Sequence, residues 1–133
     1  MPTVLIVDTS LWIDVLRDAG KRGALEAAIG GDDVYLTRFM QIELLAGATR
    51  EEQWHRLATY LDGQRYLEPE PDTWRQASRT FFELQRLGTP ARSPVECCIA
   101  EIAIAHKALL LHHDQDFGVI AALRPLQERW IEL

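Results

Sequence analysis

Val4-Leu5-Ile6-Val7-Asp8-Thr9-Ser10 is the stretch that decides the fold. Its four consecutive apolar residues are typical of a short strand that is buried on both faces, at the centre of a parallel sheet covered by helices. Ligands of open α/β sheets bind just beyond the carboxyl ends of the strands, so Asp8 is a candidate functional residue. A helix cap formed by Asp8, Thr9 or Ser10 explains the same residues without any chemistry.

The rest of the chain alternates between helical and strand patterns. We predict further strands at 34–37, 66–67, 108–111 and 130–131, and helices at 11–16, 21–29, 39–46, 49–62, 72–87, 94–107 and 119–123. Capping boxes are predicted to open two of these helices, at Thr49 to Glu52 and at Ser93 to Glu96. The alternation predicts one α/β domain over residues 1–133, a three-layer α/β/α sandwich with a mostly parallel central sheet.

Composition and charge exclude several classes of protein. The 133 residues are 47% hydrophobic and 26% charged, as expected for a single globular domain. No apolar run is long enough to span a membrane and no secretory signal is evident, so we expect a cytoplasmic protein. Cys97 and Cys98 are adjacent and cannot link distant parts of the fold. The net charge of −6 argues against a non-specific nucleic-acid binder, which normally has a basic footprint.

Several acidic residues are predicted to lie at one edge of the sheet, because they come just after a strand or near the start of a helix. Asp8, Asp114 and Asp116 follow the two most apolar strands, and Glu96 lies in the first turn of a helix. Glu43 lies within an otherwise apolar helical segment. If the two strands are parallel neighbours, these carboxylates meet at one edge.

A cluster of carboxylates is electrostatically unfavourable unless a cation neutralises it. Oxygen ligands of this kind suit Mg²⁺ or Mn²⁺, and such a metal can activate water against a phosphodiester. Each acid also has a structural interpretation. Glu43 could be a surface residue, Glu96 could complete a capping box, and Asp114 and Asp116 could be turn residues.

Four motifs make the chain resemble the PIN-domain ribonucleases, and in particular the VapC-type toxins of bacterial toxin–antitoxin modules. They are Ile6-Val7-Asp8-Thr9-Ser10-Leu11-Trp12-Ile13, Ile42-Glu43-Leu44-Leu45-Ala46-Gly47, Val95-Glu96-Cys97-Cys98-Ile99-Ala100 and Leu110-Leu111-His112-His113-Asp114-Gln115-Asp116-Phe117. Their order and spacing extend the resemblance over essentially the whole chain.

The resemblance implies the fold, the activity and the roles of the motif residues. It implies a catalytic quartet of Asp8, Glu43, Glu96 and Asp114, with Asp8, Glu96, Asp114 and Asp116 as the candidate ligands of Mg²⁺ or Mn²⁺. It also implies that Thr9 and Ser10 orient the first aspartate. The implied activity is metal-dependent endonucleolytic cleavage of RNA, the implied partner is a small VapB-like antitoxin, and the implied assembly is a homodimer.

Two residues depart from the pattern of that family. Glu96 stands where aspartate is usual, and its extra methylene group changes the reach of the carboxylate toward Mg²⁺. His112 stands where many members have Thr or Ser, which replaces a hydroxyl group by a titratable ring. Packing at the end of the strand is the alternative to a phosphate contact by His112.

Arg38, Arg92 and Arg124 are candidates for phosphate contacts, with a solvated surface charge as the alternative for each, and Arg92 is the first to test because it lies two residues from the helix of Glu96. With few such cations, we expect a restricted RNA substrate recognised by its shape or in a single-stranded loop.

Two other functions compete with the nuclease. The departures at Glu96 and His112 allow a catalytically weakened module that binds antitoxin or RNA without cutting it. A phosphoacceptor receiver domain shares the pattern of the first strand. That fold requires a second acid directly after the strand, where this chain has Thr9.

Overall fold

The computed structural model describes residues 3–89 and 93–133. Its four strands form one parallel sheet in the order β2-β1-β3-β4. The strands are β1 (Val4–Val7), β2 (Asp33–Tyr35), β3 (Leu109–His112) and β4 (Glu128–Trp130). The predicted pairing of the first strand with the strand near residue 110 is therefore confirmed, with Ile6 opposite Leu110.

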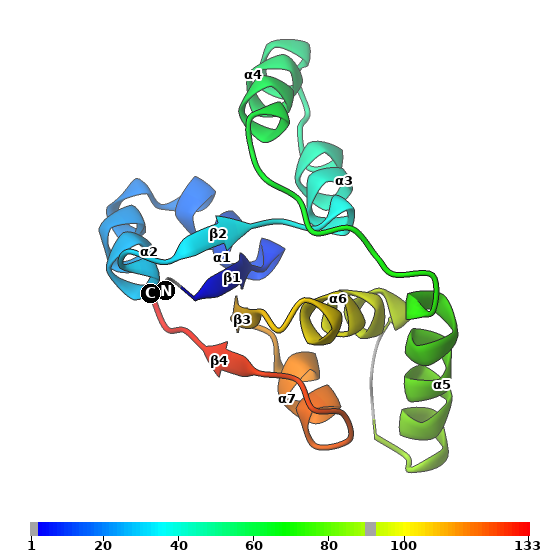
Figure 1. The fold of residues 1–133 in the computed structure, drawn as a ribbon. Helices are drawn as coiled ribbons and strands as arrows, with labels where there is room; N and C mark the ends of the chain where they lie inside the picture. The colour runs from blue at the N-terminus through cyan, green and yellow to red at the C-terminus, as the bar shows by residue number, and fades with distance from the viewer. Residues whose placement is uncertain (1–2, 90–92) are drawn as a thin grey trace.

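Alternate residues of the central strands point to opposite faces of the sheet, and each face has its own core. Ile6 and Leu110 pack in the larger core, whereas Leu5, Val7 and Leu111 pack in the smaller one. Helices therefore cover both faces (Figure 1), and the predicted three-layer α/β/α sandwich is confirmed.

The smaller core is covered by α1 (Thr9–Arg17) and α2 (Arg22–Ile29), which are joined by the short helix η1 (Ala19–Lys21). The larger core is covered by helices that come from the rest of the chain. These are α3 (Arg38–Ala46), α4 (Glu51–Asp62), α5 (Thr73–Arg86), α6 (Pro94–Ala105) and α7 (Gln115–Ala121).

Some predicted boundaries are wrong, for local reasons. The weak strand at 66–67 is a single bridge between Leu36 and Tyr66. Thr49 does not cap α4, because the helix begins at Glu51 and the Thr49 backbone N–H donates instead to Gln53 Oε1. The helix predicted at 119–123 begins at Gln115, because Asp114 caps it.

No helix in the described part of the chain is long and apolar enough to cross a membrane.

Candidate functional site

Asp8 follows the last residue of β1 and is the N-cap of α1. Its Oδ2 accepts a hydrogen bond from the Ser10 backbone N–H at 3.1 Å and another from the Ser10 hydroxyl at 2.7 Å. Of the three residues considered for the cap, it is therefore Asp8 and not Thr9 or Ser10. Only 5% of Asp8 is exposed, so a buried carboxylate lies at the edge of the sheet.

Thr9 orients a different acid from the one predicted. Its hydroxyl donates to Glu43 Oε1 at 3.2 Å, which connects α1 with α3. Thr9 therefore holds Glu43, and the side chain that holds Asp8 is that of Ser10.

Asp114 and Asp116 lie where β3 leads into α7. Asp114 Oδ1 accepts a hydrogen bond from the Asp116 backbone N–H at 3.0 Å, and Asp116 is buried in the first turn of the helix. These residues therefore belong to a helix N-terminus and are not in a turn.

Glu96 enters the site from the first turn of α6. The predicted cap of this helix is confirmed at Ser93, whose hydroxyl accepts a hydrogen bond from the Val95 backbone N–H at 3.1 Å. Glu96 Oε2 is buried and has no hydrogen-bond partner among the described residues. A capping box alone therefore does not account for this carboxylate.

Electrostatic coupling shows that the acids form one cluster. Burial raises the pKa of Asp8 above its usual value, and the negative charge of Asp114 raises it further. Partial burial also raises the pKa of Glu43, assisted by the charges of Asp8 and Asp114. The pKa of Glu96 is raised by burial and by the charges of Asp114, Asp116 and Glu43. We call these five residues the acidic cluster.

The composition of the acidic cluster fits a hard divalent cation. Its donors are all carboxylate oxygens, as Mg²⁺ and Mn²⁺ prefer, and Glu96 Oε2 is a buried oxygen that lacks a proton donor. Among residues 3–89 and 93–133, no three His, Cys, Asp or Glu side chains are already arranged to hold a metal ion. The donor set fits the ion, but the carboxylates would have to move to coordinate it.

The sequence signature of the PIN domain matches residues 5–123. The chain belongs to the PIN-domain family. This confirms the resemblance on which the site residues were assigned.

Known proteins and solved structures that are similar to this PIN domain carry the names VapC or VapBC. Ribonuclease VapC11 of Mycobacterium tuberculosis is 29% identical over 129 residues, covering 93% of this chain and 96% of the relative. A solved structure of VapBC-1 from nontypeable Haemophilus influenzae superposes with a TM-score of 0.76 at 21% identity, covering 96% of this chain and 97% of the other. VapBC2 from Rickettsia felis, bound to promoter DNA, gives a TM-score of 0.76 at 16% identity and covers 98% and 100% of the two chains. Both structures show that the fold is shared.

His112 is a buried residue of the PIN domain and does not face solvent. It is 1% exposed, and its Nδ1 accepts a hydrogen bond from the Asp114 backbone N–H at 3.2 Å. Nε2 lies 3.1 Å from Glu128 Oε1, so the imidazole is the tautomer with its proton on Nε2. The predicted contact between His112 and RNA is therefore wrong, and its role is packing at the end of β3.

The three arginines proposed for phosphate contacts have different outcomes. Arg124 forms two hydrogen bonds with the buried carboxylate of Glu101, and its contact with phosphate stays a prediction. Arg38 lies over the Tyr66 ring and pairs with Glu68 at 3.2 Å. Arg92 is outside the described residues.

Two further acids beside the site were not identified from the sequence. Asp14 Oδ2 lies 3.3 Å from His113 Nδ1, and Glu128 on β4 is the partner of His112. Asp14 lies four residues, or one helical turn, after Ser10. This spacing could have indicated from the sequence that Asp14 lies beside the site. The contact with Glu128 depends on β4 pairing with β3, which no local pattern predicts.

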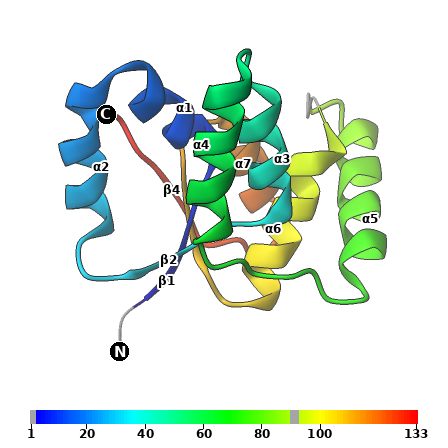
Figure 2. The ribbon, with the colours of Figure 1, turned by 90° about the horizontal axis from the view of Figure 1, so that it is seen from above.

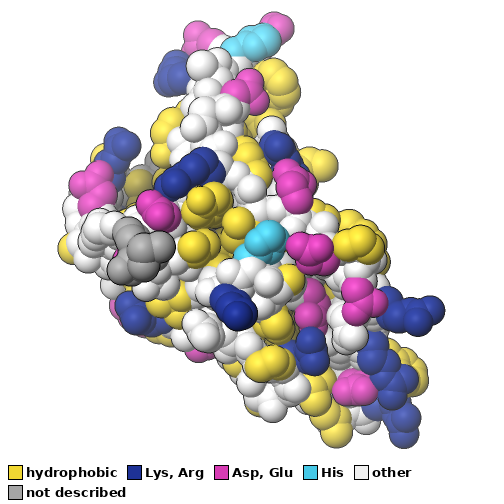
Figure 3. Space-filling model, viewed as in Figure 1, with side chains coloured by type: hydrophobic (Ala, Val, Ile, Leu, Met, Phe, Trp, Pro, Cys, Tyr) yellow, Lys and Arg dark blue, Asp and Glu magenta, His cyan; other side chains and the backbone are white. Residues whose placement is uncertain are grey.

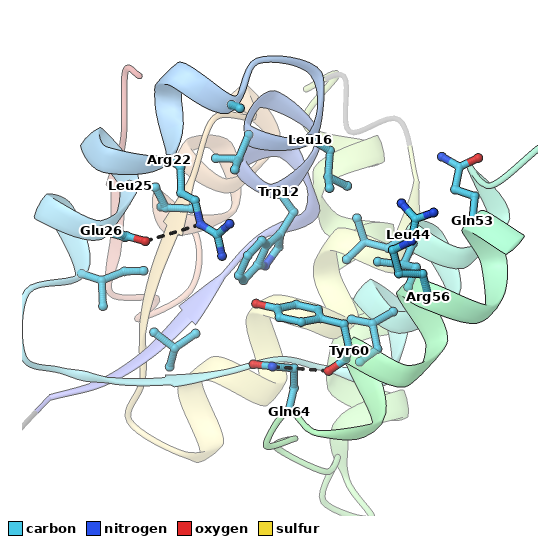
Figure 4. A pocket seen from close by; sticks show the side chains of 16 residues that line it. Trp12, Leu16, Arg22, Leu25, Glu26, Leu44, Gln53, Arg56, Tyr60 and Gln64 are labelled. Carbon is cyan, nitrogen blue, oxygen red and sulfur yellow. Dashed lines mark hydrogen bonds and ion pairs between the residues drawn. The ribbon is translucent and has the colours of Figure 1, made fainter.

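An apolar groove of about 750 Å³ lies between the α1–α2 side of the PIN domain and α4. Trp12 and Tyr60 meet in it edge to face, with ring centroids 6.4 Å apart, and Leu16 lies beside it (Figure 4). Trp12 is held by a hydrogen bond from its Nε1 to the Val7 carbonyl, one residue before Asp8. The groove and the acidic cluster therefore share the β1–α1 junction.

Proposed function

We propose that this PIN domain is a metal-dependent endoribonuclease, a toxin of the VapC type that hydrolyses RNA phosphodiester bonds. The observation that carries the proposal is the acidic cluster, in which three carboxylates have raised pKa values and one buried oxygen lacks a partner. The relative with 29% identity is named a ribonuclease, and this supports the same chemistry for the chain.

The proposed metal ligands are Asp8, Glu96, Asp114 and Asp116, with Mg²⁺ or Mn²⁺ as the ion. When bound, such an ion polarises the phosphate and activates the attacking water. Glu43 completes the catalytic quartet from the outer side of the site, where the Thr9 hydroxyl holds its carboxylate.

The residues around the cluster fix where the carboxylates point. Ser10 holds Asp8 through two donors, and the Asp116 backbone N–H holds Asp114. Such outer hydrogen bonds limit the directions in which Asp8 and Asp114 can turn when they move to coordinate a cation.

Asp8→Asn tests the proposed activity. Asparagine keeps an oxygen to cap α1 but removes one negative charge, so cleavage of RNA with Mg²⁺ or Mn²⁺ should fall by at least about 100-fold, the scale of a lost electrostatic contribution at an active site. The matched control is Asp18→Asn, because Asp18 caps η1 through the Gly20 backbone N–H at 3.0 Å and lies outside the cluster. Cleavage that survives both Asp8→Asn and a chelator would refute the proposal.

A weakened PIN module that binds without cutting is the alternative function. Glu96 motivates it, because its longer side chain ends in a buried oxygen without a partner. If the natural chain is inactive with both metals and Glu96→Asp creates activity, the binding module is the correct interpretation. Activity of the natural chain that Glu96→Asp leaves unchanged or lowers supports the nuclease.

We also propose an antitoxin as the protein partner, with the apolar groove as the surface it covers. Structures similar in fold are VapBC toxin–antitoxin complexes, which supports such a partner. Trp12, Leu16 and Tyr60 offer apolar contacts, as in complexes where an amphipathic helix binds in a groove. A homodimer and a cytoplasmic location, where RNA is available, stay predictions.

A further inference from the structure

The outer face of α5 combines arginine side chains with an exposed aromatic ring. Arg75, Arg79, Phe82 and Arg86 follow one another at intervals of four, three and four residues, which places them on one side of the helix. All four are exposed. The opposite side is buried and consists of Thr73, Ala77, Thr80 and Leu84. We call the four exposed residues the arginine face.

Two guanidinium groups flank the ring of Phe82. The Cζ atom of Arg79 lies 5.1 Å from the ring centroid, and that of Arg86 lies 5.8 Å from it. Such cation–π contacts hold arginine side chains beside an aromatic surface. Phe82 remains 47% exposed, so the ring is still available to another molecule.

The positive charge of the arginine face is local. The chain has 20 acidic and 14 basic residues, yet three cations gather along this one helix. One of the three, Arg79, forms an ion pair with Glu83 through its Nε at 2.8 Å. Figure 3 shows Lys and Arg side chains gathered in the region of α5, with hydrophobic side chains between them.

One end of the arginine face lies near the first turn of α6, although the face itself points outward from the core. Helix α5 lies alongside α6 and runs in the opposite direction (Figure 2). Its C-terminal end, where Arg86 lies, is therefore on the same side of the molecule as the first turn of α6, which carries Glu96. The residues from Arg75 to Arg86 span about 16 Å along the helix, enough to follow several nucleotides.

We propose that the arginine face binds a single-stranded flanking segment of the RNA substrate, which leaves the acidic cluster past the Arg86 end of α5. The guanidinium groups contact phosphates, and a base stacks on Phe82 between them. Aromatic rings combined with cations are the means by which proteins bind single strands without reading their sequence. This inference rests on the proposed function, because it assigns a binding surface to the substrate of that reaction.

Binding is measured on the Asp8→Asn chain, in which RNA stays intact. The probe is a fluorescein-labelled oligouridylate, and its anisotropy is followed at several salt concentrations. The combined variant Arg75→Gln, Arg79→Gln and Arg86→Gln should bind at least about 10-fold more weakly. It should also reduce the slope of log K against log salt by about 2, since each phosphate contact to a single strand contributes roughly 0.7.

The matched control replaces three exposed arginines on other elements, in the combined variant Arg17→Gln, Arg50→Gln and Arg129→Gln. It has the same net charge as the first variant, so only position differs. Equal loss of binding in both variants, or no loss in the first, overturns the proposal. So does a result in which the first variant loses binding to an antitoxin but keeps binding to RNA, because the arginine face would then be a surface for protein.

Phe82→Leu separates stacking from charge. Leucine keeps an apolar side chain but removes the ring, so oligouridylate should bind about 5-fold or more weakly. Binding of inorganic polyphosphate, which has no bases, should stay unchanged. If both ligands weaken equally, or neither weakens, the assigned role of Phe82 is wrong.

The two proposals fail in different ways. Should the natural chain cleave RNA while the arginine variants bind and cleave as well as it does, the arginine face is refuted and the nuclease stands. Conversely, a chain that never cleaves but binds oligouridylate through these arginines refutes the nuclease and supports the binding surface.

Discussion

The Ser10 hydroxyl joins the carboxyl ends of the two central strands through Asp8. Ser10 Oγ donates to Asp8 Oδ2 at 2.7 Å and accepts the His113 backbone N–H at 3.0 Å. One side chain therefore fixes the carboxylate after β1 and the backbone that leads from β3 to Asp114. Ser10 is a positioning residue that acts on two acids of the cluster.

Ser10→Ala should lower cleavage by about 10- to 100-fold, the usual effect of removing an outer hydrogen bond at a metal site. The concentration of Mn²⁺ needed for half-maximal activity should rise, because Asp8 loses its orientation, and Ser10→Thr should restore most of it. The control is Ser78→Ala, since the hydroxyl of exposed Ser78 donates to the carbonyl of Arg75 within α5 and lies outside the acidic cluster. A loss of stability in Ser10→Ala without a change in the metal requirement would show that the hydroxyl is merely structural.

Stability should depend on pH through the acidic cluster. A carboxyl group with a raised folded-state pKa binds more protons when folded, so it contributes stability at low pH and loses that contribution as the pH rises through the folded-state pKa. For Asp8 the loss begins above the ordinary value of 3.8. The free energy of unfolding of Asp8→Asn, minus that of the natural chain, should therefore grow as the pH rises above about 4. Urea titrations at a series of pH values measure this difference, and a constant difference would contradict the raised pKa.

Divalent cations should stabilise the folded natural chain more as the pH rises, which is opposite to the pH dependence expected without metal. Metal ions compete with protons for carboxylates, so Mn²⁺ should raise the melting temperature more at about pH 8 than at about pH 5. A concentration 100 times the Kd would add about 2.7 kcal/mol. Scanning calorimetry of Asp8→Asn should show little of this gain, while Asp18→Asn should keep all of it. If Mn²⁺ raises the melting temperature of both variants by the same amount, the ion binds outside the acidic cluster.

The pair of Arg124 and Glu101 should be important for stability. Arg124 Nε lies 2.7 Å from Glu101 Oε1, and the Glu101 side chain is 6% exposed. Arg124→Ala leaves that carboxylate buried without its partner and should cost about 3 kcal/mol of unfolding free energy. Glu101→Leu should cost less, because the partly exposed Arg124 can reach water. In the control Arg22→Ala, whose ion pair with Glu26 is exposed, the loss should stay below about 1 kcal/mol. Equal losses for Arg124→Ala and Glu101→Leu would contradict this asymmetry.

The sequence predicts the centre of the fold and the members of the site because both depend on strong local patterns. The apolar run before Asp8 is typical of a buried strand, and the apolar run before His112 is similar, so their carboxyl ends would meet if the two strands were parallel neighbours, which they are. Asp8, Asp114 and Asp116 were proposed from their positions just after strands and Glu96 from the first turn of a helix, whereas Glu43, within α3, depended on the resemblance to the PIN family.

Side-chain contacts between elements could not be predicted in this way. Thr9 and Ser10 are adjacent hydroxyl residues, and only the rotation of α1 decides that Thr9 reaches Glu43 while Ser10 reaches Asp8. His112 is a polar residue at a strand end, and it is buried because β4 brings Glu128 to its Nε2. Such contacts depend on the order of the strands, which is a property of the whole chain.

The apolar groove leads to the last prediction, on the antitoxin. Leu16 lines the groove and is 63% exposed, so Leu16→Glu should leave the fold intact while placing a charge on an apolar contact surface. We expect the affinity for the cognate antitoxin to fall by at least about 10-fold, because burying a charge without a partner costs more than 1.4 kcal/mol. The control is Leu87→Glu, a substitution at a 69% exposed leucine on the far side of the larger core. Isothermal titration calorimetry with the purified antitoxin compares the affinities of the Leu16→Glu and Leu87→Glu variants. In addition, RNA cleavage by Leu16→Glu should become resistant to the antitoxin, while its rate without antitoxin stays unchanged. If Leu87→Glu weakens the complex and Leu16→Glu does not, the antitoxin binds to another surface.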